Sequence, residues 1–168
     1  MKIVPKSQEV TFKNDILLVT KTDLKGKITY ANRAFTQIVN IEEKILIGSP
    51  HNIIRHPDMP KIIFKYLWRY VQEGNEIHAY VKNLTSDGSY YWVFANVTPS
   101  YDTNSHSKII GYHSTRSHPT KEALAIIKPL YEKLLKSEKS HGVEASEKIL
   151  KNILDDKGMK YDEFILSI

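Results

Sequence analysis

The sequence contains no cysteine, and this absence excludes several kinds of chemistry at once. Without thiols the chain forms no disulfide, zinc–cysteine site, iron–sulfur cluster or cysteinyl photoadduct. No stretch approaches the roughly 20 apolar residues of a membrane-spanning helix, and the opening MKIVPKSQEV lacks the apolar core of a secretion signal. We therefore expect a cytoplasmic protein without a membrane span of its own.

A strong charge of either sign is also missing. The formal net charge is +5, and the 24 basic residues are spread along the chain without a run of five. This spacing is typical of a solvated surface, so we expect no nucleic-acid partner. With 41% hydrophobic and 26% charged residues over 168 positions, the composition is that of one globular domain with an extension.

The hydrophobic periodicity predicts two strands, several short helices, one longer helix and then three strands, followed by further helices. Such segregation of elements is typical of an α+β fold with an antiparallel sheet and its helices on one face. The predicted strands are residues 16–21, 27–31, 76–84, 89–98 and 108–117; the predicted helices are residues 33–39, 41–47, 60–74 and 121–137, with two shorter helices within 144–168.

The stretch PHNIIRHPDMP, residues 50–60, concentrates charged and ring-bearing side chains. His51 and His56 are five positions apart, so on a helix they would point about 140° from each other, unlike the paired ligands of HExxH. No serine stands in a GxSxG elbow, and we expect neither a metal site nor a nucleophilic enzyme. A purely structural interpretation remains open, in which Arg55 pairs with Asp58 and His56 caps a helix end.

The strand that starts near residue 77 has a small, apolar face that ends in Asn83. An odd-length loop centred on Gly88 would place Val93 and Ala95 on the same face, whereas a two-residue turn would align Asn83 with Trp92. We favour the odd-length loop, because its small inner face leaves a cavity that a flat ligand can fill. Asn83 then needs a polar partner, either a backbone group near the turn or the ligand. The favoured inner face is Ile77, Ala79, Val81, Asn83, Val93 and Ala95.

Taken together, the motifs resemble one known family. The chain reads TDLKGKITYAN, PHNIIRHPDMPK, FKYLW, VKN, DGSYYWVFAN and GYHSTR in this order. This series is similar to the FAD-binding PAS domains of Aer-like aerotaxis receptors over about residues 22–135. A PAS domain with a short helical tail also resembles the soluble PAS halves of bipartite energy-taxis receptors. The resemblance implies a five-stranded antiparallel PAS sheet, with an N-terminal cap segment at 1–15, a sensor domain at 16–118 and a helical extension at 119–168.

The resemblance further implies a non-covalently bound FAD whose redox state reports electron transport, in a sensor that is not an enzyme. Two positions depart from the family pattern: Ile77 stands where a tryptophan is common, and His113, expected near the cofactor, stands where an apolar residue is common. In this interpretation Arg55 binds the pyrophosphate through its planar fork, and Asn83 responds to the redox state because an amide both donates and accepts. The residues implied to shape or line the flavin site are Asn32, Arg55, His56, Asp58, Phe64, Trp68 and Asn83.

A redox signal in such a chain needs a second protein to carry it onward. The resemblance implies a membrane-anchored methyl-accepting chemotaxis-type receptor, contacted near its HAMP region, which would hold the protein at the inner membrane. We expect the contact on an exposed strip of Tyr80, Tyr90, Trp92 and Phe94, unless the N-terminal segment or a helix over residues 124–135 covers it. A homodimer, a haem-binding PAS gas sensor and a cofactor-free PAS interaction module remain open alternatives.

Overall fold

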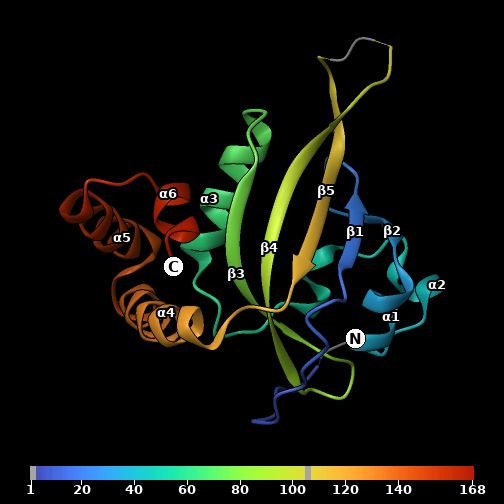
Figure 1. Ribbon diagram of the computed structural model, residues 1–168, viewed down its shortest axis with the longest axis horizontal. Coiled ribbons are helices and arrows are strands. Elements are labelled where there is room, and N and C mark those ends of the chain that lie inside the picture. The colour runs from blue at the N-terminus through green and yellow to red at the C-terminus, as the bar shows by residue number, and fades with distance from the viewer. Residues whose placement is uncertain (1–2, 105–106) are drawn as a thin grey trace.

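The computed structural model describes residues 3–104 and 107–168. Its centre is an antiparallel sheet with the strand order β2-β1-β5-β4-β3, so β2 and β3 form the two edges (Figure 1). The strands are β1 (Leu18–Thr22), β2 (Ile28–Ala31), β3 (Ile77–Leu84), β4 (Tyr90–Tyr101) and β5 (Ile109–Ser117). The predicted α+β class and five antiparallel strands are confirmed, with bounds that differ by a few residues.

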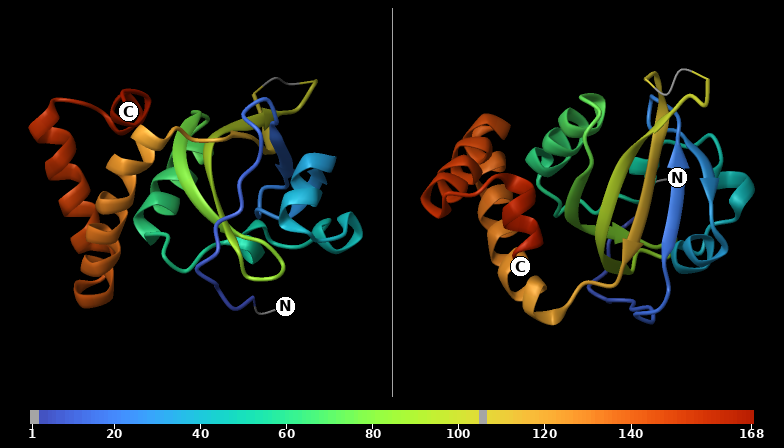
Figure 2. Two further views of the ribbon diagram at one scale, coloured as in Figure 1. Left: turned by 60° about the horizontal axis from the view of Figure 1, so that its bottom comes forward. Right: turned by 45° about the horizontal axis from the view of Figure 1, so that its top comes forward.

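The helices form two groups in sequence order (Figures 1 and 2). The first group precedes β3 in sequence, and the second follows β5 and gathers beside the edge strand β3. The helices are α1 (Arg33–Val39), α2 (Glu43–Leu46), the 3-10 turn η1 (His51–Ile54), α3 (Lys61–Gln72), α4 (Lys121–His141), α5 (Val143–Lys157) and α6 (Tyr161–Leu166). Within the described ranges, no helix is long and apolar enough to cross a lipid bilayer.

The register of the β3–β4 hairpin creates the inner face of the sheet. Val81 pairs with Val93 and Ala79 pairs with Ala95, across a loop that runs from Leu84 to Tyr90. The loop is odd in length, as the sequence predicts, but it is centred on Asp87 rather than Gly88, so Asn83 pairs with Tyr91. Because side chains alternate along a strand, these four small residues lie together on the face that α3 covers. These small side chains therefore leave space between the sheet and α3.

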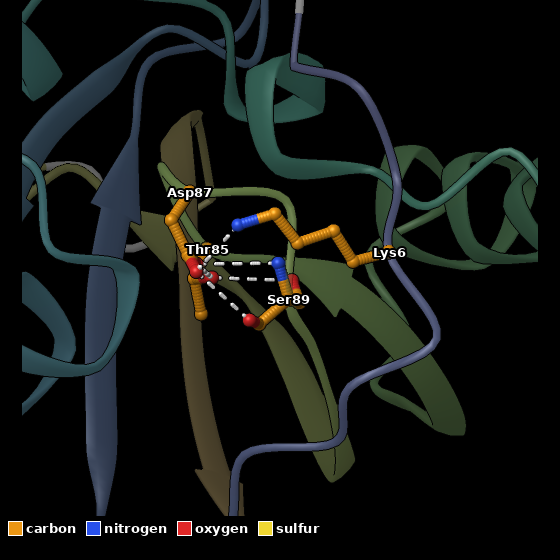
Figure 3. A network of polar contacts seen from close by, with 4 residues as sticks. All are labelled: Lys6, Thr85, Asp87 and Ser89. Atoms are coloured by element: carbon orange, nitrogen blue, oxygen red, sulfur yellow. Dashed lines mark hydrogen bonds and ion pairs between the residues drawn. The ribbon is translucent and has the colours of Figure 1, made fainter.

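Asp87 organises the loop of this hairpin (Figure 3). Its carboxylate accepts hydrogen bonds from the hydroxyl groups of Thr85 and Ser89, and Lys6 of the N-terminal segment lies 3.2 Å from it. Hydrogen bonding, first from Thr85 and then from the Ser89 backbone, holds the pKa of Asp87 far below its usual range. Gly88 has a φ of 92°, and a Cβ there would lie 2.0 Å from a carbonyl oxygen of the crossing N-terminal segment. The hairpin loop and the N-terminal segment therefore pack so closely that a side chain at position 88 would clash with the segment.

The outer face of β3 and β4 is covered by other parts of the same chain. Tyr80 and Trp92 are 4% and 7% exposed. The hydroxyl of Tyr131 in α4 donates to the carbonyl oxygen of Tyr80 at 2.8 Å, and its ring lies 6.1 Å from that of Trp92. The N-terminal segment bridges Tyr90 through Glu9. The prediction that this aromatic strip is exposed is therefore wrong. The apolar face of α4 and the N-terminal segment cover it, which is the alternative given in the sequence analysis. Helix α3 covers one face of the sheet, as predicted, and α4 of the C-terminal extension covers part of the other face.

Carboxylates join the C-terminal helices to α3 and β3. Glu138 of α4 accepts hydrogen bonds from the backbone N–H groups of Lys61 and Ile62 at 2.8 and 2.9 Å. Asp162 of α6 accepts from the backbone N–H of His78, on the free edge of the sheet, at 2.9 Å. The residue before α3 is a proline without a side-chain acceptor, so the cap of this helix comes from the C-terminal part of the chain.

Candidate functional site

A cavity of about 170 Å³ lies between the inner face of the sheet and α3. The small inner face leaves this space, as the sequence predicts. Its apolar lining is Phe64, Leu67, Trp68 and Val71 of α3 with Val81, Ala95 and Val97 of the sheet. Its polar lining includes Thr20, His51, Arg55, Asn83, Ser114 and Arg116. A flat, partly apolar molecule with polar or charged edges suits such a lining.

Four of the predicted site residues come together at this cavity. Phe64 and Trp68 lie one helical turn apart on α3, and Asn83 borders the cavity from β3. The ring of Trp68 packs edge-on against Tyr112 at 5.5 Å. Arg55 places its guanidinium 3.5 Å above the ring of Phe64. The aromatic and polar parts of the predicted site are thus neighbours.

The guanidinium of Arg55 is only partly satisfied by the protein. Its Nε is buried without a hydrogen-bond partner, and burial lowers the pKa of the group. The proposed pairing with Asp58 is not formed, because the Asp58 carboxylate binds the Lys82 ammonium at 2.8 Å instead. Among the described residues, no carboxylate forms an ion pair with Arg55. The guanidinium of Arg55 therefore borders the cavity with an N–H group that is free to donate to a ligand.

Three predicted residues do not border the cavity. Asn32 caps α1 by accepting from the backbone N–H of Phe35 at 3.0 Å. The Nδ1 atom of His56 accepts from the backbone N–H of Asp58 at 3.1 Å. This bond lies within the loop between η1 and α3, so His56 does not cap either helix. His56 is 4% exposed, whereas Asp58 stands at the surface. These three side chains bind groups in the segments around the cavity and do not line it.

His113 lies on the opposite face of the sheet from the polar lining. Its cross-strand partners are Lys21 and Thr98, whereas its neighbours Tyr112 and Ser114 stand on the face toward α3. The residue borders the cavity, but strand alternation turns its imidazole outward. Burial, followed by the charge of Lys21, lowers the pKa of this imidazole. The even-numbered residues of β5 face the cavity, so the expected position of His113 beside a cofactor ring stays a prediction.

Sequence reasoning missed a buried polar cluster of Thr20, His51 and Arg116. The guanidinium of Arg116 donates to Oγ1 of Thr20 at 3.0 Å and to Nε2 of His51 at 2.9 Å. A guanidinium only donates, so Nε2 accepts and the single ring proton of His51 is on Nδ1. Burial and the charge of Arg116 hold the pKa of His51 at about 3, so the imidazole is neutral. No local signal in the sequence identifies this cluster, because Arg116 and Thr20 are 96 positions apart.

Two arginines, Arg55 and Arg116, border the cavity, and neither has a carboxylate partner among the described residues. Arg116 is 6% exposed, burial lowers its pKa to about 10, and none of the described carboxylates pairs with it. The hydroxyl of Ser114, which also borders the cavity, is buried without a partner. Buried donors and cations without acceptors are unfavourable unless a ligand completes them. The described residues contain no cluster of three acidic or histidine side chains that would hold a metal ion.

An antiparallel sheet that encloses a small-molecule cavity beneath short helices is the arrangement of a ligand-binding sensor domain. The chain belongs to the PAS family: the family model described as PAS fold matches residues 28–113. The aerotaxis receptor of Escherichia coli (strain K12) is 39% identical over 127 residues, which are 76% of this chain and 24% of the receptor. The chain thus spans about a quarter of that receptor's length. The bacterioopsin transcriptional activator of Halobacterium salinarum is 24% identical over 87 residues, 52% of this chain and 13% of that protein.

Solved structures share the fold at low sequence identity. A PAS domain from Colwellia psychrerythraea has a TM-score of 0.56 at 22% identity and covers 62% of this chain and 87% of its own. A light-oxygen-voltage domain studied with a flavin analogue has a TM-score of 0.57 at 15% identity, with coverages of 67% and 84%. The blue-light-activated histidine kinase of Erythrobacter litoralis has a TM-score of 0.56 at 16% identity, with coverages of 71% and 42%. The resemblance to aerotaxis-type PAS domains that the motifs carry is confirmed.

Proposed function

We propose that this protein is a redox sensor that binds FAD non-covalently in the cavity and signals to a chemoreceptor-type partner. The observation that carries the proposal is that the half-buried Arg55 and the buried Arg116 border one aromatic and apolar cavity. Neither arginine forms an ion pair with a carboxylate of the described residues. A flavin dinucleotide combines a flat ring for such walls with a pyrophosphate for a guanidinium. The similarity to an aerotaxis receptor and to a domain studied with a flavin analogue supports the same ligand class.

The residues around the cavity fit this cofactor in type. Arg55 would bind the pyrophosphate with the donor edge that its contact to Phe64 leaves free, and Trp68 would border the ring. Asn83 would hydrogen-bond the polar edge of the ring through its amide. The bound flavin would supply the ability to take up and release electrons. The chain binds and orients it, while Asn32, His56 and Asp58 would keep the surrounding loops in shape.

We propose no catalytic activity for the chain. Residues 1–15 would act as a cap, residues 16–118 as the sensor and residues 119–168 as the output helices. A membrane-anchored methyl-accepting chemotaxis-type receptor would be the partner, contacted near its HAMP region. Because α4 and the N-terminal segment cover the aromatic strip of the sheet, we now assign this contact to α4, α5 and α6.

An absorption spectrum of the freshly purified protein tests the cofactor. We expect flavin bands, and we expect FAD rather than FMN when the chromophore released by denaturation is identified by mass. A Soret band would instead support a haem sensor. Protein that carries no chromophore and does not bind added FAD would overturn the proposal and favour a cofactor-free interaction module.

A further inference from the structure

Arg116 is more deeply buried than the other arginine of the cavity, Arg55. It projects from β5, where its neighbours across the sheet are Leu18 of β1 and Ala95 of β4. The hydrogen-bond acceptors that it reaches, Thr20 and His51, are both neutral. A buried cation whose partners carry no negative charge is costly to the folded protein. Such a group is retained more readily at a functional site than in a structural core.

The two arginines of the cavity occupy different depths. Arg116 lies beneath the first group of helices, with its guanidinium 5.6 Å from the ring of the fully buried Phe35. Arg55 is half-buried, in the connection between η1 and α3. A ligand with its phosphates at Arg55 therefore directs its other, ring-bearing end toward Arg116. The deeper position is the drier one, so a fixed charge there acts through a lower effective dielectric constant.

The neighbours of Arg116 hold its charge in one place. Thr20 and His51 accept three donor contacts from its two terminal nitrogens, out of the five N–H groups of a guanidinium. His51 uses Nε2 as an acceptor and cannot take up a proton beside this cation, so the positive charge stays on Arg116. The unpartnered hydroxyl of Ser114 borders the same end of the cavity. The N–H groups of Arg116 that do not contact Thr20 or His51 could donate to a ligand.

We propose that Arg116 makes the cavity prefer the more negatively charged redox form of its ligand, and so sets the reduction potential of the bound flavin. This inference rests on the proposed flavin-binding function. Two electrons from a reductant and one proton from solvent leave the flavin ring with one negative charge. Arg116 attracts that charge and gains less from the neutral oxidised ring, so it stabilises the reduced form selectively. Arg116 therefore discriminates between the oxidised and the reduced state of one ligand.

Equilibrium titration with dithionite and a reference dye tests the preference. In Arg116→Gln we expect the midpoint potential to fall by about 30 mV, which corresponds to a tenfold loss of preference for the reduced form in a two-electron couple. Arg116→Lys should restore most of the difference, and Arg33→Gln, at an exposed position, is the matched control. An unchanged potential in Arg116→Gln with flavin bound would overturn the inference. A native protein that binds no flavin would instead overturn the proposed function, and this inference with it.

Unfolding of the flavin-free proteins decides the case in which Arg116→Gln no longer retains flavin. If Arg116 is directed at the ligand, removing its uncompensated charge leaves the denaturation midpoint of the flavin-free protein unchanged or higher. If Arg116 instead holds β1 to the loop of His51 as a structural link, the flavin-free variant unfolds earlier than the native protein. The first result supports the inference even without bound flavin, and the second overturns it.

Discussion

Glu138 is expected to stabilise the chain far more than an exposed glutamate of the same helix. It projects from α4 and accepts the backbone N–H groups of Lys61 and Ile62, the first two residues of α3. Loss of a helix cap typically costs about 1 kcal/mol, and loss of a negative charge at a helix N-terminus costs about 0.5–1 kcal/mol more. We therefore expect Glu138→Ala to lower the free energy of unfolding by about 2 kcal/mol.

Two further variants separate the contribution of the hydrogen bonds from that of the negative charge. Glu138→Gln keeps one acceptor oxygen but loses the charge, so about half of the effect should remain. Glu132→Ala changes the same residue type at an exposed position of α4 and should stay within about 0.5 kcal/mol of the native protein. Urea unfolding with an unchanged m-value measures all three variants.

Equal stabilities of Glu138→Ala and Glu132→Ala would refute this reasoning. That result would mean that solvent replaces the carboxylate at α3 without loss, and that α4 is not coupled to the helix that lines the cavity. The hydroxyl of Ser146 donates to both Glu138 and the carbonyl oxygen of Val143, so it keeps a partner in the alanine variant and does not confuse the comparison.

Three further changes test the cavity and the turn. Arg55→Ala should weaken FAD binding at least tenfold more than riboflavin binding, because riboflavin lacks phosphates; equal losses, measured by fluorescence titration, would make Arg55 structural. Trp68→Ala should lower the flavin occupancy of the purified protein, read from the absorbance ratio, and full occupancy would remove it from the ligand contacts. Asp87→Asn should reduce thermal stability at pH 7 but progressively less below about pH 4. The lowered pKa of Asp87 contributes its full stability above the pKa of the unfolded chain, and this contribution is lost as the pH falls toward the pKa of the folded chain. Parallel melting curves of native and variant protein from pH 7 to pH 2 would contradict this.

Features with a local cause were predictable from the sequence. Asn32 caps the helix that begins at the next residue, because its side chain reaches a backbone N–H three positions on. Gly88 marks the odd-length hairpin loop, because the left-handed conformation there favours glycine. The alternation that follows from this register then gave the small inner face and the cavity. In each case the deciding interaction lies within one element or one turn.

Features with distant partners were not predictable in the same way. The cap of α3 comes from Glu138, more than 70 positions away, and Arg116 meets Thr20 at a separation of 96 positions. The parity of β5 could not be decided from the sequence, because KIIGYHSTRS carries polar and apolar residues on both faces and hydrophobicity does not distinguish them. The aromatic strip was expected to be exposed because no local signal shows that α4 folds back over it. Long-range packing decided all of these points.

Strand β3 connects the cavity to the C-terminal helices. Asn83 borders the cavity from one end of the strand, while the carbonyl oxygen of Tyr80 and the N–H of His78 bind Tyr131 of α4 and Asp162 of α6. We therefore expect flavin binding to increase the protection of the His78 amide against hydrogen exchange, because a ligand that fixes β3 also fixes its edge contact. The N–H groups at the start of α3 should respond with it, since Glu138 holds them from the same helical group. Exchange measured by NMR with and without FAD tests this, with the amide of Lys151, in the exposed face of α5, as the control. Unchanged protection at His78 would show that occupation of the cavity does not reach the C-terminal helices through this strand.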